Sequence, residues 1–289
     1  MRDLNGKVAV VTGGASGIGL AMAERFGREG VKIVIADIQE DAIQRAVTGL
    51  KANGFEAIGV RTDVSKFSDV EALAQATLEA FAKVHIVVNN AGVSITGPTW
   101  EMSLDDWRWV HGVNLWGVIH GVKAFTPILI RQGEPGHIIN TASLASFNGT
   151  GEHAPYCSSK AACLSLSQSL YSELIAANTQ IGVSVVCPGM VATDIHRSWR
   201  NRPAGDRPWS EREWNDPIHR ANSERFQGQG VEPERIAEAT LDAVLNDRFY
   251  VFYGEGTRPF LEYVLRPIVE AENPPVITWG RDLRLQAGT

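Results

Sequence analysis

The sequence of 289 residues contains only three cysteines, Cys157, Cys163 and Cys187. They form no CxxC or other metal-ligand spacing, so no metal site is expected. An odd number of cysteines without a secretion signal indicates free thiols in a reducing compartment. Residues 1–20 lack the profile of a signal peptide, because the apolar run Val8–Val11 is too short. No stretch approaches the roughly 20 apolar residues of a membrane-spanning helix, and we therefore expect a cytoplasmic protein.

Long runs of a single charge sign are also absent. Charged residues make up 21% of the chain and the formal net charge is −6. This balance argues against a nucleic-acid partner, because binding to a phosphate backbone needs clustered Lys and Arg. Basic residues gather only between Arg197 and Arg212, where Asp206, Glu211 and Glu213 dilute them, so a solvated loop is expected there. The 44% of hydrophobic residues can bury a large core.

Short β-branched apolar runs alternate along the chain with longer helical patterns. The expected strands are Lys7–Thr12, Lys32–Ala36, Ala57–Arg61, Val84–Asn89, His137–Thr141, Gly182–Cys187 and Phe249–Tyr253. The expected helices are Ile18–Glu29, Gln39–Ala52, Phe67–Ala82, Leu104–Arg131, Pro155–Ala177 and Pro233–Asn246. Strands that are apolar on both faces and separated by helices predict a parallel sheet covered on both sides. We expect one α/β domain with a Rossmann-like, doubly wound sheet of about seven strands, whose ligands bind at the carboxyl ends of the strands.

Two segments do not follow this alternation. Residues 190–230 are irregular and rich in Trp, Arg and Pro, and residues 255–289 continue beyond the last expected strand. Within the second segment, Arg258–Glu270 has a helical pattern. No internal repeat or flexible linker divides the chain, so residues 1–289 are expected to form a single domain.

The first expected strand leads into a glycine-rich turn, TGGASGIG at 12–19, which opens the first helix. Glycines let a backbone approach a pyrophosphate, and the amino end of a helix supplies amide donors. Such a turn alone is weak evidence, but Asp37 follows at the end of the second strand, 18 residues beyond Gly19. A carboxylate there accepts hydrogen bonds from the ribose hydroxyls of NAD and repels the 2′-phosphate of NADP. Neither Ser16, Ile38 nor Gln39 offers the cation that NADP requires, so NAD is favoured over NADP.

The next strand ends extend this nucleotide site. Asp63 and Val64 are expected beside the adenine, and Ala91 and Gly92, at the end of the fourth strand, leave room for a ribose. Each position alone is consistent with an ordinary strand end, but together they line one edge of one sheet. The residues predicted from these strand ends to bind the cofactor are Gly13, Ser16, Gly17, Ile18, Gly19, Asp37, Ile38, Asp63, Val64, Asn90, Ala91 and Gly92.

Tyr156 and Lys160 are spaced four residues apart in an expected helix, so they lie on one face of it. A free phenol has a pKa of about 10, and moving that pKa toward 7 takes about 4 kcal/mol. A neighbouring ammonium in a partly desolvated cleft, together with an oxidised nicotinamide, can supply this stabilisation of the phenolate. The phenolate would take the proton of an alcohol while hydride leaves. A tyrosine packed in a core beside a surface lysine would show the same spacing.

The motifs resemble those of the short-chain dehydrogenase/reductase family over about residues 5–254. The matching positions are TGGASGIG at 12–19, NNAG at 89–92, Asn114, Ser143, YCSSK at 156–160 and PGMVAT at 188–193. The resemblance implies that Tyr156 is the acid/base and that Lys160 lowers its pKa and holds the nicotinamide ribose. It also implies that Ser143 polarises the substrate oxygen and that Asn114 anchors a water next to Lys160. The residues implied to hold the nicotinamide end are Pro188, Gly189, Val191 and Thr193.

Asn114 interrupts an expected helix with a poor helix former, which suggests a task other than helix formation. His85 and His153 are the nearest alternative bases in sequence, but neither stands in a recognisable catalytic or metal spacing. Neither is expected to act in catalysis, and His153 is expected to line the cleft.

In the family, the segment after PGMVAT is a mobile lid, here residues 190–230, with Trp199, Trp209 and Trp214. Large rings there suit a bulky apolar or aromatic substrate, although they could equally pack the lid onto its own protein or a neighbour. The residues expected to contact substrate are Ser143, Ala145, His153, Tyr156, Ile195 and Trp199. The extension, residues 255–289, would wrap a neighbouring subunit or cap the active site, and it is distantly similar to bacterial dehydrogenases of benzylic alcohols. The resemblance implies a homotetramer or homodimer.

These expectations converge on an NAD-dependent oxidoreductase that interconverts a secondary alcohol and a ketone. Three alternatives remain open at this point: an NADP-preferring carbonyl reductase, a non-catalytic nucleotide-sensing protein on the same fold, and an isomerase or dehydratase that uses NAD transiently. The sensor is disfavoured because Ser143, Tyr156 and Lys160 are all present.

Overall fold

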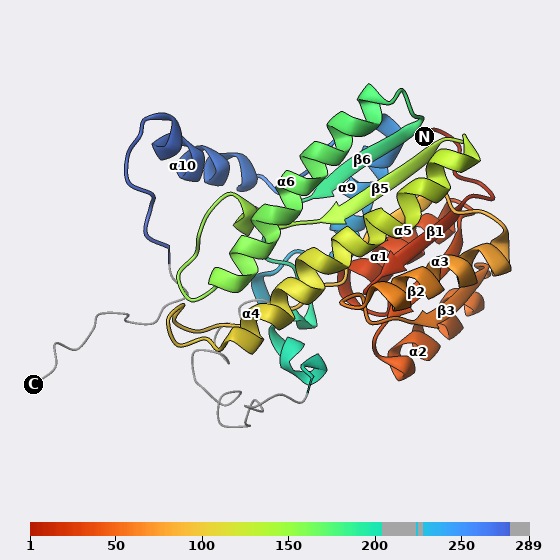
Figure 1. Ribbon diagram of the computed structural model, residues 1–289, viewed down its shortest axis with the longest axis horizontal. Helices are drawn as coiled ribbons and strands as arrows, with labels where there is room; N and C mark the ends of the chain where they lie inside the picture. Colours follow the sequence, from red (N-terminus) through yellow and green to blue (C-terminus); the bar gives the residue numbers. More distant parts are fainter. Residues whose placement is uncertain (204–223, 225–227, 278–289) are drawn as a thin grey trace, which may run out of the picture.

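The computed structural model, which describes residues 1–203, 224 and 228–277, contains one seven-stranded sheet (Figure 1). The strands are β1 (Val8–Thr12), β2 (Lys32–Asp37), β3 (Ala57–Arg61), β4 (Ile86–Asn89), β5 (Gly136–Thr141), β6 (Ile181–Val186) and β7 (Tyr250–Val251). Their spatial order is β3-β2-β1-β4-β5-β6-β7, and every neighbouring pair is parallel. The strand order reverses between β1 and β4, which is where doubly wound sheets bind ligands. The predicted Rossmann-like sheet is confirmed.

Successive residues of the central strands point to opposite faces, and each face is covered by helices. On one face Val11 and Ile33 pack with side chains of α1 (Gly17–Arg28), α2 (Glu40–Ala52) and α9 (Pro233–Asn246). On the other, Val10 and Val34 pack with α3 (Phe67–Phe81), α5 (Gly117–Gln132) and α6 (Ala154–Ala176). The two apolar layers explain why the strands lack polar alternation. Helix α10 (Thr257–Val269) stands away from the sheet (Figure 1).

The single helix expected over Leu104–Arg131 is instead three consecutive elements. These are α4 (Leu104–His111), the π-helical turn η1 (Gly112–Trp116) and α5. A π-helical turn inserts an extra residue into the helix, and such turns occur mostly at functional sites. Here it contains Asn114, the residue whose type argued against an ordinary helical position.

The run Leu104–Gln132 is also long and apolar enough, by length and composition, to cross a membrane, with a window of mean hydropathy 1.3. This differs from the expectation that no stretch would approach such a length. In the fold its Phe125 and Leu129 lie within the core on the α5 face of the sheet. Packing against the sheet accounts for the apolar face of this helix.

Candidate active site

The carboxyl ends of β1, β4 and β5 are joined by a short hydrogen-bond network. The Thr12 hydroxyl donates to Val88 O (3.2 Å) and accepts from the backbone N–H groups of Asn90 (2.9 Å) and Ala91 (3.2 Å). The Asn90 amide donates to Thr12 O (3.1 Å) and its oxygen accepts from the Thr141 hydroxyl (3.3 Å). Thr12 and Thr141 therefore hold these strand ends together. Neither threonine was predicted from the sequence to have a role, although Thr12 is the first residue of the glycine-rich motif.

The glycine-rich turn leaves a hollow that side chains would fill. Gly13 has φ +60°, and a Cβ there would lie 2.8 Å from Ala91 Cα. Gly17, at the start of α1, has φ +52°, and its Cβ would lie 3.1 Å from Thr193 Cγ2. A Cβ at Gly19 would approach Gly13 O to 2.2 Å, so this glycine permits close packing of helix and turn. The hollow lies at the amino end of α1, where backbone amides and the helix dipole favour a pyrophosphate.

Asp37 ends β2 beside this turn. Its carboxylate accepts hydrogen bonds from the backbone N–H groups of Ala15 (3.3 Å) and Gln39 (3.1 Å). These contacts fix the carboxylate at the rim of the nucleotide cavity, where it is positioned to accept ribose hydroxyls. The geometry fits the NAD preference predicted from the sequence.

One cavity of about 610 Å³ collects almost all of the predicted residues. Those that line it are Gly13, Ser16, Gly17, Ile18, Asp37, Ile38, Asp63, Val64, Asn90, Ala91, Gly92, Ser143, Ala145, His153, Tyr156, Lys160, Pro188, Gly189, Val191, Thr193 and Ile195. Three predicted residues, Gly19, Asn114 and Trp199, are not among the described residues that line it. Gly19 packs behind the turn and Asn114 is buried behind the catalytic end.

Ser143, Tyr156 and Lys160 meet at the end of the cavity opposite Asp37. The Lys160 ammonium donates to Thr141 O (2.7 Å) and lies 5.8 Å from the centre of the Tyr156 ring. Burial raises the pKa of Tyr156 to about 12, and a hydrogen bond with the Ser143 hydroxyl opposes this shift. Burial also lowers the pKa of Lys160. The residues of the chain alone thus keep Tyr156 a neutral phenol, because desolvation outweighs the lowering of its pKa expected from Lys160.

Asn114 is fully buried next to this pair. Its side chain accepts from Val93 N (2.8 Å) and donates to Val93 O (2.9 Å) and to the Ser159 hydroxyl (3.1 Å). A Cβ at Gly92 would lie 3.5 Å from Lys160 Nζ and 3.6 Å from Asn114 Oδ1. Gly92 therefore lies within van der Waals distance of both polar groups, which belong to the same buried corner of the site.

The first part of the expected lid is fastened to the body of the protein. It forms η3 (Asp194–Asn201), in which the Ser198 hydroxyl accepts from Ser94 N (3.1 Å). Directly after η3, Arg202 forms an ion pair with Asp106 of α4 (2.6 Å), with both side chains largely buried. These contacts fix η3 over the cavity. Trp209, Trp214 and the rest of 204–223 and 225–227 lie outside the described residues.

The carboxyl-terminal extension returns to the same cavity. After α10, Ile277 O accepts a hydrogen bond from Gly151 N (2.7 Å), five residues before Tyr156. Phe260 and Ile277 both line the cavity. Of the two expectations for the extension, the geometry favours capping of the site. The sequence could not indicate this contact, because it joins residues far apart in the chain.

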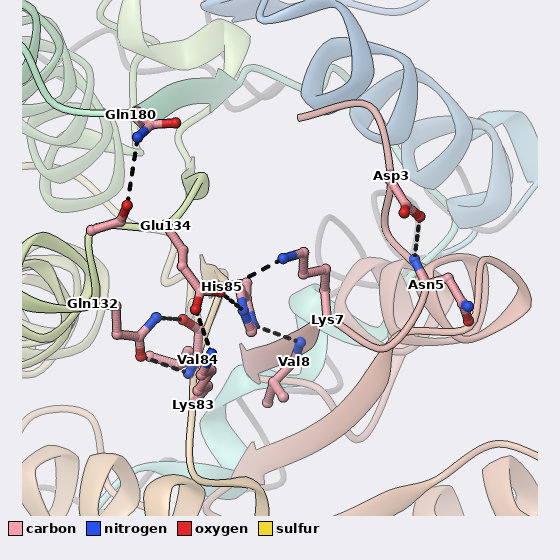
Figure 2. Close-up of polar contacts among 11 residues, drawn as sticks. Asp3, Asn5, Lys7, Val8, Lys83, Val84, His85, Gln132, Glu134 and Gln180 are labelled. Carbon is pink, nitrogen blue, oxygen red and sulfur yellow. Dashed lines mark hydrogen bonds and ion pairs between the residues drawn. The ribbon is translucent and has the colours of Figure 1, made fainter.

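The two alternative bases lie in different places. His153 is buried in the cavity wall, with its ring edge-on to Tyr156 at 6.0 Å between centroids. Figure 2 shows His85 at the start of β4, where its Nδ1 accepts from Val8 N (3.1 Å) and its Nε2 faces Glu134 (3.1 Å). Burial lowers the pKa of His85, and because Nδ1 accepts a hydrogen bond, Nε2 is the nitrogen that donates to Glu134. His85 joins strand and loop at the amino-terminal edge of the sheet, away from the cavity.

The cavity thus combines a dinucleotide cradle with a buried Ser–Tyr–Lys group, the arrangement of a nicotinamide-dependent oxidoreductase. A family profile described as short chain dehydrogenase matches residues 7–204. The chain belongs to the short-chain dehydrogenase family.

Known relatives cover nearly the whole chain. It is 35% identical over 301 residues to the C alpha-dehydrogenase of Sphingobium sp. (strain NBRC 103272 / SYK-6), covering 98% of this chain and 96% of the relative. It is 34% identical to the 1-deoxy-11-beta-hydroxypentalenate dehydrogenase of Streptomyces exfoliatus, covering 88% and 86%. A short chain dehydrogenase/reductase from Burkholderia phymatum, solved in complex with NAD, aligns with a TM-score of 0.90 at 40% identity, covering 95% and 98%. NAD is the cofactor that these findings and the Asp37 site support.

Proposed function

We propose that the protein interconverts a secondary alcohol and a ketone, with Tyr156 as the acid/base. The observation that carries the proposal is the placement of Ser143, Tyr156 and Lys160 at one end of a cavity whose other end is the Asp37 nucleotide site. NAD held in the nucleotide site would supply the acceptor for the hydride of the carbinol carbon. The remaining chemistry is the transfer of one proton, which falls to residues of this chain.

In the oxidation, the substrate O–H bond breaks and its proton passes to Tyr156 Oη; in the reduction, the phenol returns it. Ser143 donates a hydrogen bond to the substrate oxygen and so holds it at the phenol. Bringing the pKa of Tyr156 from about 12 to near 7 takes about 7 kcal/mol. Lys160 is the cation that the fold holds beside the ring. Asn114, which lies near Lys160, anchors a water that links Lys160 to solvent.

We propose a bulky apolar or aromatic substrate. Apolar side chains from separate parts of the chain contribute to the cavity wall: Val93, Leu144, Ile195, Phe260 and Ile277. An apolar wall with few polar groups is typical of sites for hydrophobic ligands. The names of the relatives, C alpha-dehydrogenase and 1-deoxy-11-beta-hydroxypentalenate dehydrogenase, agree with a dehydrogenase reaction, and the second name includes a hydroxyl group.

A screen for NADH formation tests this proposal. It compares 1-phenylethanol and other benzylic carbinols with 2-butanol, a steroid alcohol and sorbitol, each with NAD and with NADP. We expect reduction of NAD with aryl or polycyclic alcohols and little with sorbitol. Turnover restricted to sugars would refute the substrate class. An isomeric product without net NADH would favour the isomerase alternative.

We also propose that the protein works as a homodimer or homotetramer in the cytoplasm. Family resemblance supports the oligomer, and the three buried cysteines, all free thiols, agree with a reducing compartment. Light scattering coupled to size-exclusion chromatography measures the first property directly, and a monomeric mass would contradict it.

A further inference from the structure

The nucleotide end of the cavity carries an uneven set of charges. Among the described residues that line the whole cavity, the carboxylates are Asp37, Asp63 and Asp194, and the Lys and Arg side chains are Lys160 and Arg200. Lys160 is committed to the catalytic end, where it donates to Thr141 O. A dinucleotide adds two phosphate charges near the carboxylates. Among the described Lys and Arg residues that line the cavity, Arg200 is therefore the one whose positive charge can balance the phosphate charges.

The position of Arg200 follows from contacts at both ends of η3. At its start, Thr193 touches the position where Gly17 would carry a Cβ, so η3 begins against the glycine-rich turn. At its end, Arg200 Nη1 donates back to Asp194 O (3.1 Å) and Arg197 O (2.8 Å). The guanidinium is thus folded toward the beginning of η3, beside the turn.

A second observation places it on the Asp37 side. Desolvation lowers the pKa of Arg200, while Asp194 and Asp37 raise it electrostatically, so the guanidinium lies within the field of both carboxylates. It forms no ion pair with Asp37 within the part of the chain that the structure describes, and the Asp37 oxygens already accept from Ala15 and Gln39. Arg200 lines the cavity and bonds back to Asp194, the residue after Thr193, which lies against Gly17 in the glycine-rich turn at the amino end of α1.

The fold holds this arginine in place. Ser198 bonds Ser94, and Arg202 pairs with Asp106, so residues on both sides of Arg200 are fastened to the body. Within residues 1–203 and 228–277, the hydrogen bonds of Arg200 use Nη1 alone, which leaves Nη2 and Nε as donors at the exposed rim. A guanidinium with two adjacent donors matches a phosphate bidentately.

We propose that Arg200 binds the pyrophosphate of the dinucleotide and, with the amides of α1, completes its site. This makes the start of η3 part of the cofactor site, although its sequence looked like a solvated basic loop. The proposal depends on the nucleotide site and not on the identity of the substrate.

The test is equilibrium binding, which needs no substrate. Affinities for NAD, NADP, ADP and adenosine are measured by calorimetry for the native protein and for Arg200→Gln, Arg200→Lys and Arg197→Gln. Arg197 is the matched control, since it is an exposed cation of the same η3 that does not line the cavity. We expect Arg200→Gln to weaken NAD, NADP and ADP by a similar factor, about tenfold, or about 1.4 kcal/mol. Adenosine, which has no phosphate, keeps its affinity, and Arg200→Lys restores part of the loss.

Three outcomes would overturn the proposal. The first is equal affinity for ADP in Arg200→Gln and the native protein. The second is an equal loss for adenosine and ADP, which would mean that the variant disturbs the pocket rather than a phosphate contact. The third is a loss confined to NADP, which would assign Arg200 to a 2′-phosphate. A fall in the salt dependence of NAD binding in Arg200→Gln, absent from Arg197→Gln, supports the charge role independently.

Discussion

Replacing Asp37 by asparagine should erase most of the preference for NAD over NADP. The carboxylate is held by Ala15 N and Gln39 N, so asparagine can keep one of these acceptor contacts and preserve the turn. Two changes then affect binding. NAD loses hydrogen bonds to a charged acceptor, worth about 1.5–3 kcal/mol. NADP is released from repulsion between the carboxylate and its 2′-phosphate.

The magnitude of the second change follows from Coulomb's law. Two unit charges 4 Å apart interact by about 4 kcal/mol at an effective dielectric of 20, and by about 1 kcal/mol in water. Asp37 is only partly buried, so about 1–2 kcal/mol is expected. Together the two changes amount to about 2.5–5 kcal/mol, a change of roughly two to three and a half orders of magnitude in the ratio of the NAD and NADP dissociation constants.

The assay is calorimetric titration of both nucleotides at fixed ionic strength. Asp41→Asn is the matched control, because Asp41 is an exposed carboxylate in the first turn of α2 that does not line the cavity. Its ratio of dissociation constants should stay at the native value. An unchanged ratio in Asp37→Asn, with the protein folded, would refute the role of Asp37 in choosing NAD.

In steady-state assays, Ile277→Ala should raise KM for an aryl alcohol roughly tenfold, because it removes apolar surface from the cavity wall, and should leave NAD affinity unchanged. The control Val276→Ala changes a neighbouring side chain that is 91% exposed, and it should leave KM at the native value. Gly13→Ala should lower the midpoint of thermal unfolding and weaken NAD binding, because the new Cβ would contact Ala91 and the backbone has φ +60°. Gly49→Ala, in open space within α2, should instead stabilise the protein by about 0.5–1 kcal/mol. Burial lowers the pKa of His137 from 6.5 to about 3 in the folded protein. As the pH falls, the unfolded state therefore takes up this proton before the folded state does. The contribution of neutral His137 to the free energy of unfolding is full above pH 6.5 and falls as the pH drops toward 3. Denaturant titrations should show a smaller loss of stability between pH 6.5 and 4 for His137→Gln than for the native protein, and identical slopes would contradict this assignment.

The strand ends of the fold were predictable because their chemistry is local. Apolar β-branched runs marked the buried strands, and the residues just after them, Asp37 and Asn90 among them, had to converge at one edge of a parallel sheet. Right-handed connections between parallel strands place the carboxyl ends of these strands at the same edge of the sheet. The nucleotide site could therefore be predicted from the strand ends, whereas the grouping of Ser143 with Tyr156 and Lys160 was implied by the family resemblance.

Other features depend on contacts that no local pattern carries. The buried Arg202–Asp106 pair and the Gly151–Ile277 hydrogen bond each join segments far apart in the chain. The π-helical turn at Asn114 adds a residue to the helix, and the 3.6-residue periodicity of apolar positions did not predict it. The asparagine itself indicated that this position differs from an ordinary helical one. The raised pKa of Tyr156 is a consequence of how deeply the completed fold buries the ring, which the four-residue spacing to Lys160 does not determine.

The central claim is that Tyr156 carries the proton of the reaction, and its removal tests that claim most directly. In Tyr156→Phe, with an alcohol found by the screen, kcat should fall by at least about a thousandfold, within the range that general acid–base catalysis supplies. The dissociation constant of NAD should stay within about twofold of the native value. Tyr171→Phe removes a phenol from the exposed face of the same helix and should leave kcat unchanged. Retention of substantial turnover by folded, NAD-binding Tyr156→Phe would contradict the account.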